Sequence, residues 1–213
     1  KKFWRMNLNF IQRFIFSIFA IPIVLFLISL GKEYFFFILF IILLIGLYEI
    51  VKLTKITYKI IIFLILFLFL YSCVSIVNYN NGMIYIFLLL IISWLSDIGG
   101  YAFGKIIGGK KISFISHNKT YSGFIGSILF SQISLIYIFY YQINISDSIV
   151  LNSLLLVFFS LIVISGDLIF SYFKRKNDIK DYSNIIPGHG GLFDRIDGLI
   201  ILTIFFNIIL KIK

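Results

Sequence analysis

Two acidic residues lie inside long apolar runs of the chain, where a charge is costly. Asp97 belongs to the run that begins near residue 83, and Asp167 belongs to the run that begins near residue 149. Intramembrane acids usually face protein or a water-filled cavity, so both are functional candidates. On a helix, Asp97 shares a face with Gly100 and Gly104, and small residues let a ligand or another helix approach closely. That face could equally be a packing face with one satisfied acid.

Two further acids could join Asp167 in a metal site. Asp194 and Asp197 both project to one side of the last predicted helix if that helix begins there. Mg²⁺ prefers oxygen ligands, typically one or two carboxylates together with substrate phosphates. We therefore expect Asp167, Asp194 and Asp197 to bind Mg²⁺. The alternative left open by the spacing is that the last two only stabilise a helix N-terminus through its dipole.

A glycine-rich segment, Pro187-Gly188-His189-Gly190-Gly191, lies between these acids. Its glycines free the backbone amides to form a concavity that can bind an anion. Basic side chains, which bind phosphate oxygens, flank it. They are Lys174, Arg175, Lys180 and Arg195. His189 is a catalytic candidate, with a structural hydrogen-bonding role as the alternative, and the whole pattern predicts phosphoryl or nucleotidyl transfer to a lipid at the inner membrane face.

The elements that must position these residues are membrane helices. Hydrophobic residues make up 61% of the 213 residues, charged residues make up 13%, and the mean hydropathy is +1.05. Soluble domains carry about 25% charged residues, so this composition requires a bilayer. The apolar runs predict one all-α domain, residues 1–213, with about seven spans, or eight or nine if the long runs hide short helices. The expected spans are 11–30, 34–51, 59–78, 83–103, 122–142, 149–173 and 196–211.

The basic residues indicate the orientation of this bundle. With seven spans and the N-terminus inside, all 19 basic residues except Lys32, Lys211 and Lys213 lie in or beside inner loops. Cytoplasmic loops carry such an excess, so we expect a cytoplasmic N-terminus, an outside C-terminus and catalytic loops that face the cytoplasm. The net charge of +10 then attracts anionic membrane lipids. Because the charges are divided among short loops, we expect no nucleic acid partner.

Two other residues in the apolar runs have simpler interpretations. Glu49 lies near the inner end of a span and can pair with Lys52 at helical spacing. Cys73 is the single cysteine, so it cannot form an intrachain disulfide, and its apolar surroundings indicate a packing residue.

The segment Ser171 to Asp197, SYFKRKNDIKDYSNIIPGHGGLFDRID, resembles the phosphatidate cytidylyltransferase signature along its whole length. Upstream, Gly166-Asp167-Leu168 fits the approach to that signature, and Asp97 to Lys105 resembles the family's helix end rich in Gly, Ala and Tyr. The segment Ser116 to Gly123, SHNKTYSG, is similar to the family's Ser-Pro-x-Lys-Thr-Trp-Glu-Gly loop, with His, Tyr and Ser in place of Pro, Trp and Glu. The resemblance is good from Asp97 to Asp197, whereas the first 80 residues match only as hydrophobic spans, with Glu49 in the place expected for the family.

The resemblance implies a membrane-bound nucleotidyltransferase that converts CTP and phosphatidic acid into CDP-diacylglycerol and pyrophosphate in phospholipid biosynthesis. The nucleophile is a lipid phosphate oxygen that is already ionised, so cations that offset the repulsion between two polyanions matter more than a strong base. The family also implies a bacterial cytoplasmic (inner) membrane, a homodimer, and a monovalent cation as a companion to Mg²⁺.

The resemblance assigns roles residue by residue. The implied Mg²⁺ ligands are Asp167, Asp194 and Asp197. The implied catalytic residues are Lys174, Arg175, Lys180, Asp181, His189 and Arg195. The implied substrate-binding residues are Ser116, Lys119, Thr120, Gly123, Ser171, Gly188, Gly190, Gly191 and Asp97.

Two other functions remain open on the sequence. A CTP-dependent lipid kinase that acts on polyprenols would share CTP binding and membrane acids, but it should lack the full signature. A transporter would place Asp97 and Asp167 along a pathway, and such folds often contain inverted repeats, none of which is visible here.

Overall fold

Helices make up nearly all of the chain that the structure describes. The structure is a computed structural model, and it describes residues 22–112, 119–143, 148–186 and 190–212. Its helices are α2 (Lys32–Lys52), α3 (Ile56–Val77), α4 (Gly82–Ile106), α5 (Tyr121–Ser131), α6 (Ser134–Tyr140), α7 (Ile149–Lys176) and α8 (Phe193–Ile212), and residues 22–29 are also helical. Within these residues, extended pairing is limited to two isolated bridges. The all-α prediction is therefore confirmed.

Five segments of the described chain are long and apolar enough to cross a membrane. They are α2, α3, α4, the α5–α6 pair over Tyr121–Tyr140, and α7. Each predicted span after the first corresponds to one of these segments or to α8, whereas most of the predicted span 11–30 lies outside the described residues. The predicted span 122–142 is divided between α5 and α6 by a turn at Gln132 and Ile133. The chain is a polytopic membrane protein.

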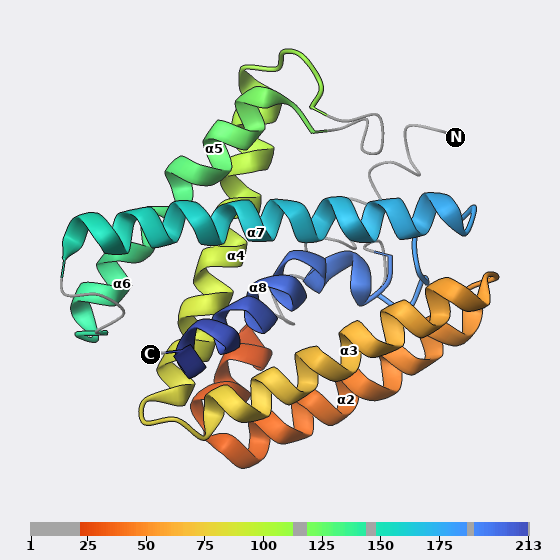
Figure 1. The fold of residues 1–213 in the computed structure, drawn as a ribbon, viewed down its shortest axis with the longest axis horizontal. Helices are drawn as coiled ribbons and strands as arrows, with labels where there is room; N and C mark the ends of the chain where they lie inside the picture. Colours follow the sequence, from red (N-terminus) through yellow and green to blue (C-terminus); the bar gives the residue numbers. More distant parts are fainter. Residues whose placement is uncertain (1–21, 113–118, 144–147, 187–189, 213) are drawn as a thin grey trace.

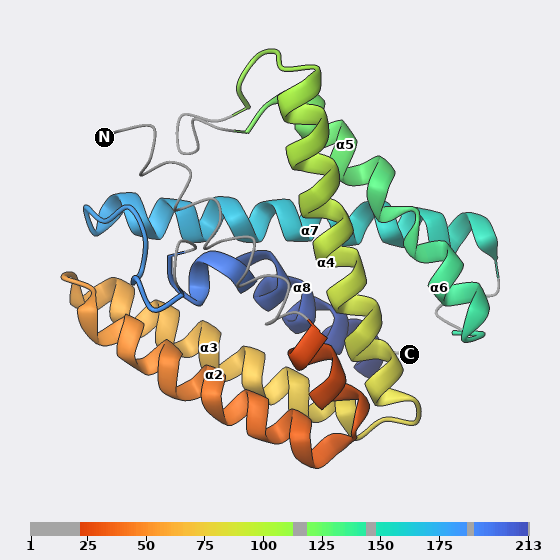
Figure 2. The ribbon, with the colours of Figure 1, turned by 180° about the vertical axis from the view of Figure 1, so that it is seen from behind.

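The helices form two groups that meet at α7 and α8. In Figure 1, α2 and α3 run side by side as a hairpin, and α8 lies between this hairpin and α7. Figure 2 shows α4 crossing α7 steeply, with α5 alongside α4 on the side away from the hairpin. α8 thus contacts α3, α4 and α7. The central position is favourable for α8 because the charged residues in its first turns are then shielded from lipid by other helices.

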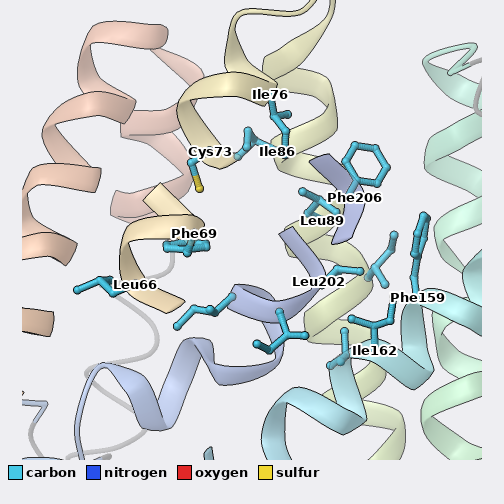
Figure 3. Close-up of a cluster of buried hydrophobic side chains, with 14 of the residues drawn as sticks. Leu66, Phe69, Cys73, Ile76, Ile86, Leu89, Phe159, Ile162, Leu202 and Phe206 are labelled. Atoms are coloured by element: carbon cyan, nitrogen blue, oxygen red, sulfur yellow. The ribbon is translucent and has the colours of Figure 1, made fainter. Parts of the chain in front are cut away.

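The apolar core fills the space between α3, α4, α7 and α8 (Figure 3). Phe159 of α7 and Phe206 of α8 are fully buried, and their ring centroids lie 5.7 Å apart. Cys73 of α3 belongs to this cluster, as expected for a packing residue. By contrast, Phe67 on the outer face of α3 is 62% exposed. Large apolar side chains face outward along the bundle because lipid, and not water, surrounds them.

Glycines allow two helix pairs to approach closely. A Cβ atom added to Gly99 of α4 would lie 2.3 Å from the carbonyl oxygen of Gly126 of α5. One added to Gly166 of α7 would lie 2.8 Å from the carbonyl oxygen of Asp197 on α8. Real Cβ atoms do not approach other atoms so closely, so these positions require glycine. Gly100 and Gly104, on the small-residue face predicted for α4, also pack against the α5 segment, since added Cβ atoms would lie 2.6 Å from Ser127 Oγ and 3.2 Å from Thr120 Oγ1. The contact at Gly166 brings α7 and α8 together at their acids.

Candidate functional site

Three acids from three helices gather where α7 and α8 meet. Asp167 lies on α7 next to Gly166, and Asp197 lies on α8 next to Gly198, so the glycine contact makes the two acids neighbours. Asp167 Oδ1 would lie 3.5 Å from a Cβ atom added to Gly198. Asp97 of α4 is close enough to repel Asp197 electrostatically. Like charges in contact are unfavourable, so such a cluster needs cations.

Two cations lie beside these acids. The Lys119 ammonium forms an ion pair with Asp167 and lies 3.5 Å from the carbonyl oxygen of Ile164. Arg195 follows one turn into α8, is exposed, and acts electrostatically on Asp97 together with Lys119. Three carboxylates therefore share a site with two basic side chains. Bound phosphates would add negative charge, and a further cation would be needed to balance it.

A cavity of about 170 Å³ opens at this cluster between α4, α5 and α7. Asp97, Asp167, Lys119 and Thr120 all line it. Thr120 is the N-cap of α5, and its hydroxyl accepts a hydrogen bond from the Gly123 amide at 3.1 Å, as N-cap threonines do. Four predicted site residues, Asp97, Lys119, Thr120 and Gly123, are thus brought together, whereas Ser116 lies outside the described residues.

Asp194 does not point into this cluster. Its carboxylate accepts hydrogen bonds from the amides of Tyr182 and Gly191, each at 2.9 Å, and pairs with the Lys174 ammonium at 2.6 Å. These donors hold Asp194 on the loop between α7 and α8, away from Asp167. Within the residues that the structure describes, no three Asp, Glu, His or Cys side chains are arranged to hold a metal ion. The structure therefore does not bring the three predicted Mg²⁺ ligands together.

The described glycines of the glycine-rich loop form hydrogen bonds within the protein. Gly190 adopts φ +88°, a conformation that favours glycine, and its carbonyl oxygen accepts a hydrogen bond from the Ile186 amide at 3.0 Å. The Gly191 amide, which was expected to face a phosphate, donates to Asp194. Gly188 and His189 lie outside the described residues.

Tyr182 fixes the start of this loop against α7. Its side chain is 2% exposed, and its phenol donates a hydrogen bond to the carbonyl oxygen of Phe170 at 3.2 Å. Burial raises the pKa of Tyr182 well above its usual range, and the nearby charges of Asp194, Asp197 and Glu49 raise that pKa further. The phenol therefore remains a neutral donor at physiological pH.

Glu49 has a larger role than its expected pairing with Lys52. Its carboxylate is fully buried and accepts hydrogen bonds from Ser183 Oγ at 2.6 Å, the Leu192 amide at 2.7 Å and the Phe193 amide at 3.0 Å. The Lys52 ammonium instead lies over the Tyr48 ring, 4.1 Å from its centroid. A charged residue inside a membrane span is costly, and this argument identified Asp97 as a functional candidate. The same argument applies to Glu49 and could have identified it as a candidate as well.

The remaining predicted residues lie around the C-terminal end of α7. Arg175, Lys180 and Asp181 are exposed, and Ser171 is half-buried on α7. Asn177 ends α7 and is buried, and its side-chain oxygen accepts a hydrogen bond from the Lys55 amide at 3.1 Å. This bond attaches the loop between α2 and α3 to the same end of the bundle.

The chain is similar in sequence to known proteins. The family model described as "Cytidylyltransferase family" matches residues 54–213. Proteins named phosphatidate cytidylyltransferase from Staphylococcus haemolyticus (strain JCSC1435) and Staphylococcus aureus (strain COL) are 37% and 40% identical over 133 residues. Each match covers 62% of this chain and 50% of the relative. The chain thus spans about half the length of the curated relatives it matches.

Proposed function

Because this chain belongs to the cytidylyltransferase family, we propose that it transfers the cytidylyl group of CTP to phosphatidic acid and releases pyrophosphate. A lipid phosphate oxygen attacks the α-phosphorus of CTP, one P–O bond forms, and the bond to pyrophosphate breaks. The observation that carries this proposal is the meeting of Asp97, Asp167 and Lys119 at one cavity, with Asp197 beside Asp167.

The cavity suits the phosphate part of such substrates. Ligand pockets commonly measure about 300–1,000 Å³, whereas this one measures about 170 Å³. It can hold phosphate groups but not a whole nucleotide or lipid. Lys119 binds phosphate oxygens in the cavity, and Arg195, which acts electrostatically on Asp97, adds positive charge nearby. Both offset the repulsion between the two polyanions. Thr120, with its hydroxyl group, lines the same cavity.

The donor set at this cavity fits Mg²⁺. Asp167 lines the cavity and Asp197 lies beside it across the glycine contact, so both can supply carboxylate oxygens. Mg²⁺ typically takes one or two carboxylates and completes its shell with water and phosphates. We assign these two residues as ligands, with Asp97 facing the same space. When bound, the ion supplies charge neutralisation at the phosphates. A second, monovalent cation remains a prediction.

Asp194 and Lys174 then support the site from the first turn of α8 and the last turn of α7. Their ion pair holds these two helix ends together and so helps to position Arg195 and Asp197, which follow on α8. Arg175 and Lys180, both exposed, extend the positive charge outward to receive the triphosphate of CTP.

The site faces the cytoplasm in this proposal, where CTP is found. At the inner ends of α2, α4 and α7, a lysine ammonium lies over the ring of the tyrosine one turn earlier in the same helix. These lysines are Lys52, Lys105 and Lys176. Tyrosine and lysine at helix ends mark the membrane interface, and basic residues gather on its cytoplasmic side. We assign the protein to the bacterial cytoplasmic membrane, and a homodimer remains a prediction.

The test is transfer of label from CTP to phosphatidic acid by the purified protein in mixed micelles. Label from the α-phosphate should enter the lipid with release of pyrophosphate. Transfer of γ-phosphate label instead would identify a lipid kinase, and transfer of neither would overturn the proposal.

Lys119→Met should lower kcat/KM by about 10- to 100-fold, since hydrogen bonds to charged groups contribute about 1.5–3 kcal/mol. Lys111→Met, an exposed lysine on the same segment, is the matched control.

A further inference from the structure

We propose that Glu49 of α2 is a positioning residue for this reaction. Its buried carboxylate fixes the N-terminus of α8 and thereby places Arg195 and Asp197 against Asp167. The activity readout below rests on the proposed function, whereas the exchange readout does not.

The contacts of Glu49 converge from one loop. Ser183 Oγ, the Leu192 amide and the Phe193 amide all donate to its two oxygens, at 2.6–3.0 Å. The first amides of a helix have no partner within the helix, and the helix N-terminus favours negative charge. A fully buried carboxylate is costly unless it is hydrogen-bonded, and the start of α8 supplies those bonds. Glu49 therefore caps α8 from a helix far away in the sequence.

Gly191 shows how closely the loop fits this carboxylate. A Cβ atom at Gly191 would lie 2.5 Å from Glu49 Oε1 and 3.0 Å from the Ser183 amide nitrogen. Any side chain at position 191 would displace the carboxylate or the loop. Glycine is thus required at position 191 to admit Glu49, in addition to any part that it has in binding phosphate.

Two carboxylates hold the loop from different elements. Asp194 binds the amides of Tyr182 and Gly191, and Glu49 binds Ser183 together with the two residues that begin α8. Asp197 follows one turn later on a helix that packs directly against α7. A displacement of about 1 Å at reacting groups can cost about 100-fold in rate. Loss of the Glu49 anchor should therefore reduce turnover even though Glu49 does not line the cavity.

Glu49→Gln tests this inference with little change in size. At least one of the three donors then faces an NH₂ group and loses its acceptor. We expect kcat to fall by about 10- to 100-fold, corresponding to about 1.5–3 kcal/mol for hydrogen bonds to a charged group. Ser183→Ala removes one donor and should cause a smaller loss, and the double variant should be less impaired than the product of the two losses. Glu33→Gln, the same change at an exposed site on α2, should leave kcat unchanged.

Hydrogen–deuterium exchange gives a second readout that needs no activity. In Glu49→Gln, exchange should accelerate at the Leu192 and Phe193 amides and stay unchanged in the core of α3 and α7. Unchanged kcat, or a loss of kcat matched by faster exchange throughout the bundle, would overturn the proposal. If the unaltered protein transferred no label from CTP, the proposed function would fail. Amide exchange at Leu192 and Phe193 would still show whether Glu49 holds the start of α8.

Discussion

Gly166 of α7 and Gly198 of α8 face each other with no side chain between them. A Cβ atom at Gly166 would lie 2.9 Å from the Gly198 Cα atom, and one at Gly198 would lie 2.7 Å from Val163 Cγ1. Each glycine is the neighbour in sequence of an acid of the cluster. The distance between the Asp167 and Asp197 carboxyl groups is therefore set by the closest backbone contact between the two helices.

Gly198→Ala should separate these helices and weaken the site. The added methyl group meets Val163 on α7, and overpacking of this kind typically costs about 1–3 kcal/mol. We expect a lower unfolding temperature in detergent and a loss of kcat of about 10-fold or more. Ile208→Ala on the exposed face of α8 should change neither value appreciably. A Gly198→Ala protein with full activity would contradict the importance of this contact.

Asp167→Asn and Asp197→Asn should each abolish most turnover. Asp197→Asn removes negative charge from a cluster of like charges and keeps an oxygen for the Gly198 amide, so thermal stability without Mg²⁺ should stay equal or rise. Asp167→Asn relieves the same repulsion but also weakens a partly exposed ion pair with Lys119, so the change in its thermal stability should be small. Metal ions supply several kcal/mol of charge stabilisation, so kcat should fall by about 100-fold or more. Mg²⁺ titration of activity and thermal unfolding without metal check both parts. Asp178→Asn, at an exposed residue with φ +56° that asparagine tolerates, is the control.

Asp194→Asn should behave differently from those two variants. The Tyr182 and Gly191 amides donate to one oxygen of Asp194, and the Lys174 ammonium pairs with the other oxygen. In asparagine an NH₂ group replaces one of these oxygens, so it faces either both amides or the Lys174 ammonium. Removing one partner of a buried ion pair costs about 3 kcal/mol or more, so we expect a clear fall in thermal stability along with activity. Excess Mg²⁺ should not restore turnover. Restoration by high Mg²⁺ with unchanged stability would instead make Asp194 a direct metal ligand.

Tyr182→Phe tests the alkaline limit of stability. The raised pKa of Tyr182 means that the folded state keeps this proton when the unfolded chain has released it. The contribution to stability is complete below the unfolded pKa of about 10 and is lost as the pH rises toward the folded pKa. The unaltered protein should therefore lose stability between about pH 9 and pH 11 more steeply than Tyr182→Phe. Thermal unfolding at these two pH values measures the difference, and equal slopes would contradict it.

The fold and the family could be predicted from the sequence because each depends on strong local signals. The apolar runs predicted α2, α3, α4, α7 and α8 to within a few residues, and the resemblance at residues 97–197 indicated the cytidylyltransferase family, which is confirmed. The turn between α5 and α6 was missed because it contains no glycine or proline, and the short polar stretch Ser131-Gln132-Ile133-Ser134 is flanked by apolar residues on both sides. Runs that are apolar at nearly every position carry little periodicity, so they do not show which face of a helix packs against protein.

Long-range contacts account for what could not be predicted in the site. Helical spacing correctly placed Asp194 and Asp197 near the start of one helix, but it could not reveal the amides of Tyr182 and Gly191 that turn Asp194 toward the loop. Glu49 was paired with its neighbour Lys52 because local spacing favoured that pair. Its three donors come from a loop far along the chain, and only the folded structure brings them together.

The lysine–tyrosine pairs at the inner helix ends also set a depth for the chemistry. Asp97 precedes Lys105 by about two turns and Asp167 precedes Lys176 by about two and a half turns, or about 12–14 Å along each helix axis. If these pairs mark the membrane interface, the acids lie below the level at which lipid headgroups normally rest. In the proposed reaction, phosphatidic acid would then have to move its phosphate toward the hydrocarbon layer, and CTP would have to reach the same depth. Dehydration of the phosphates would contribute to the barrier of that reaction, and Lys119 would replace part of the water that they lose.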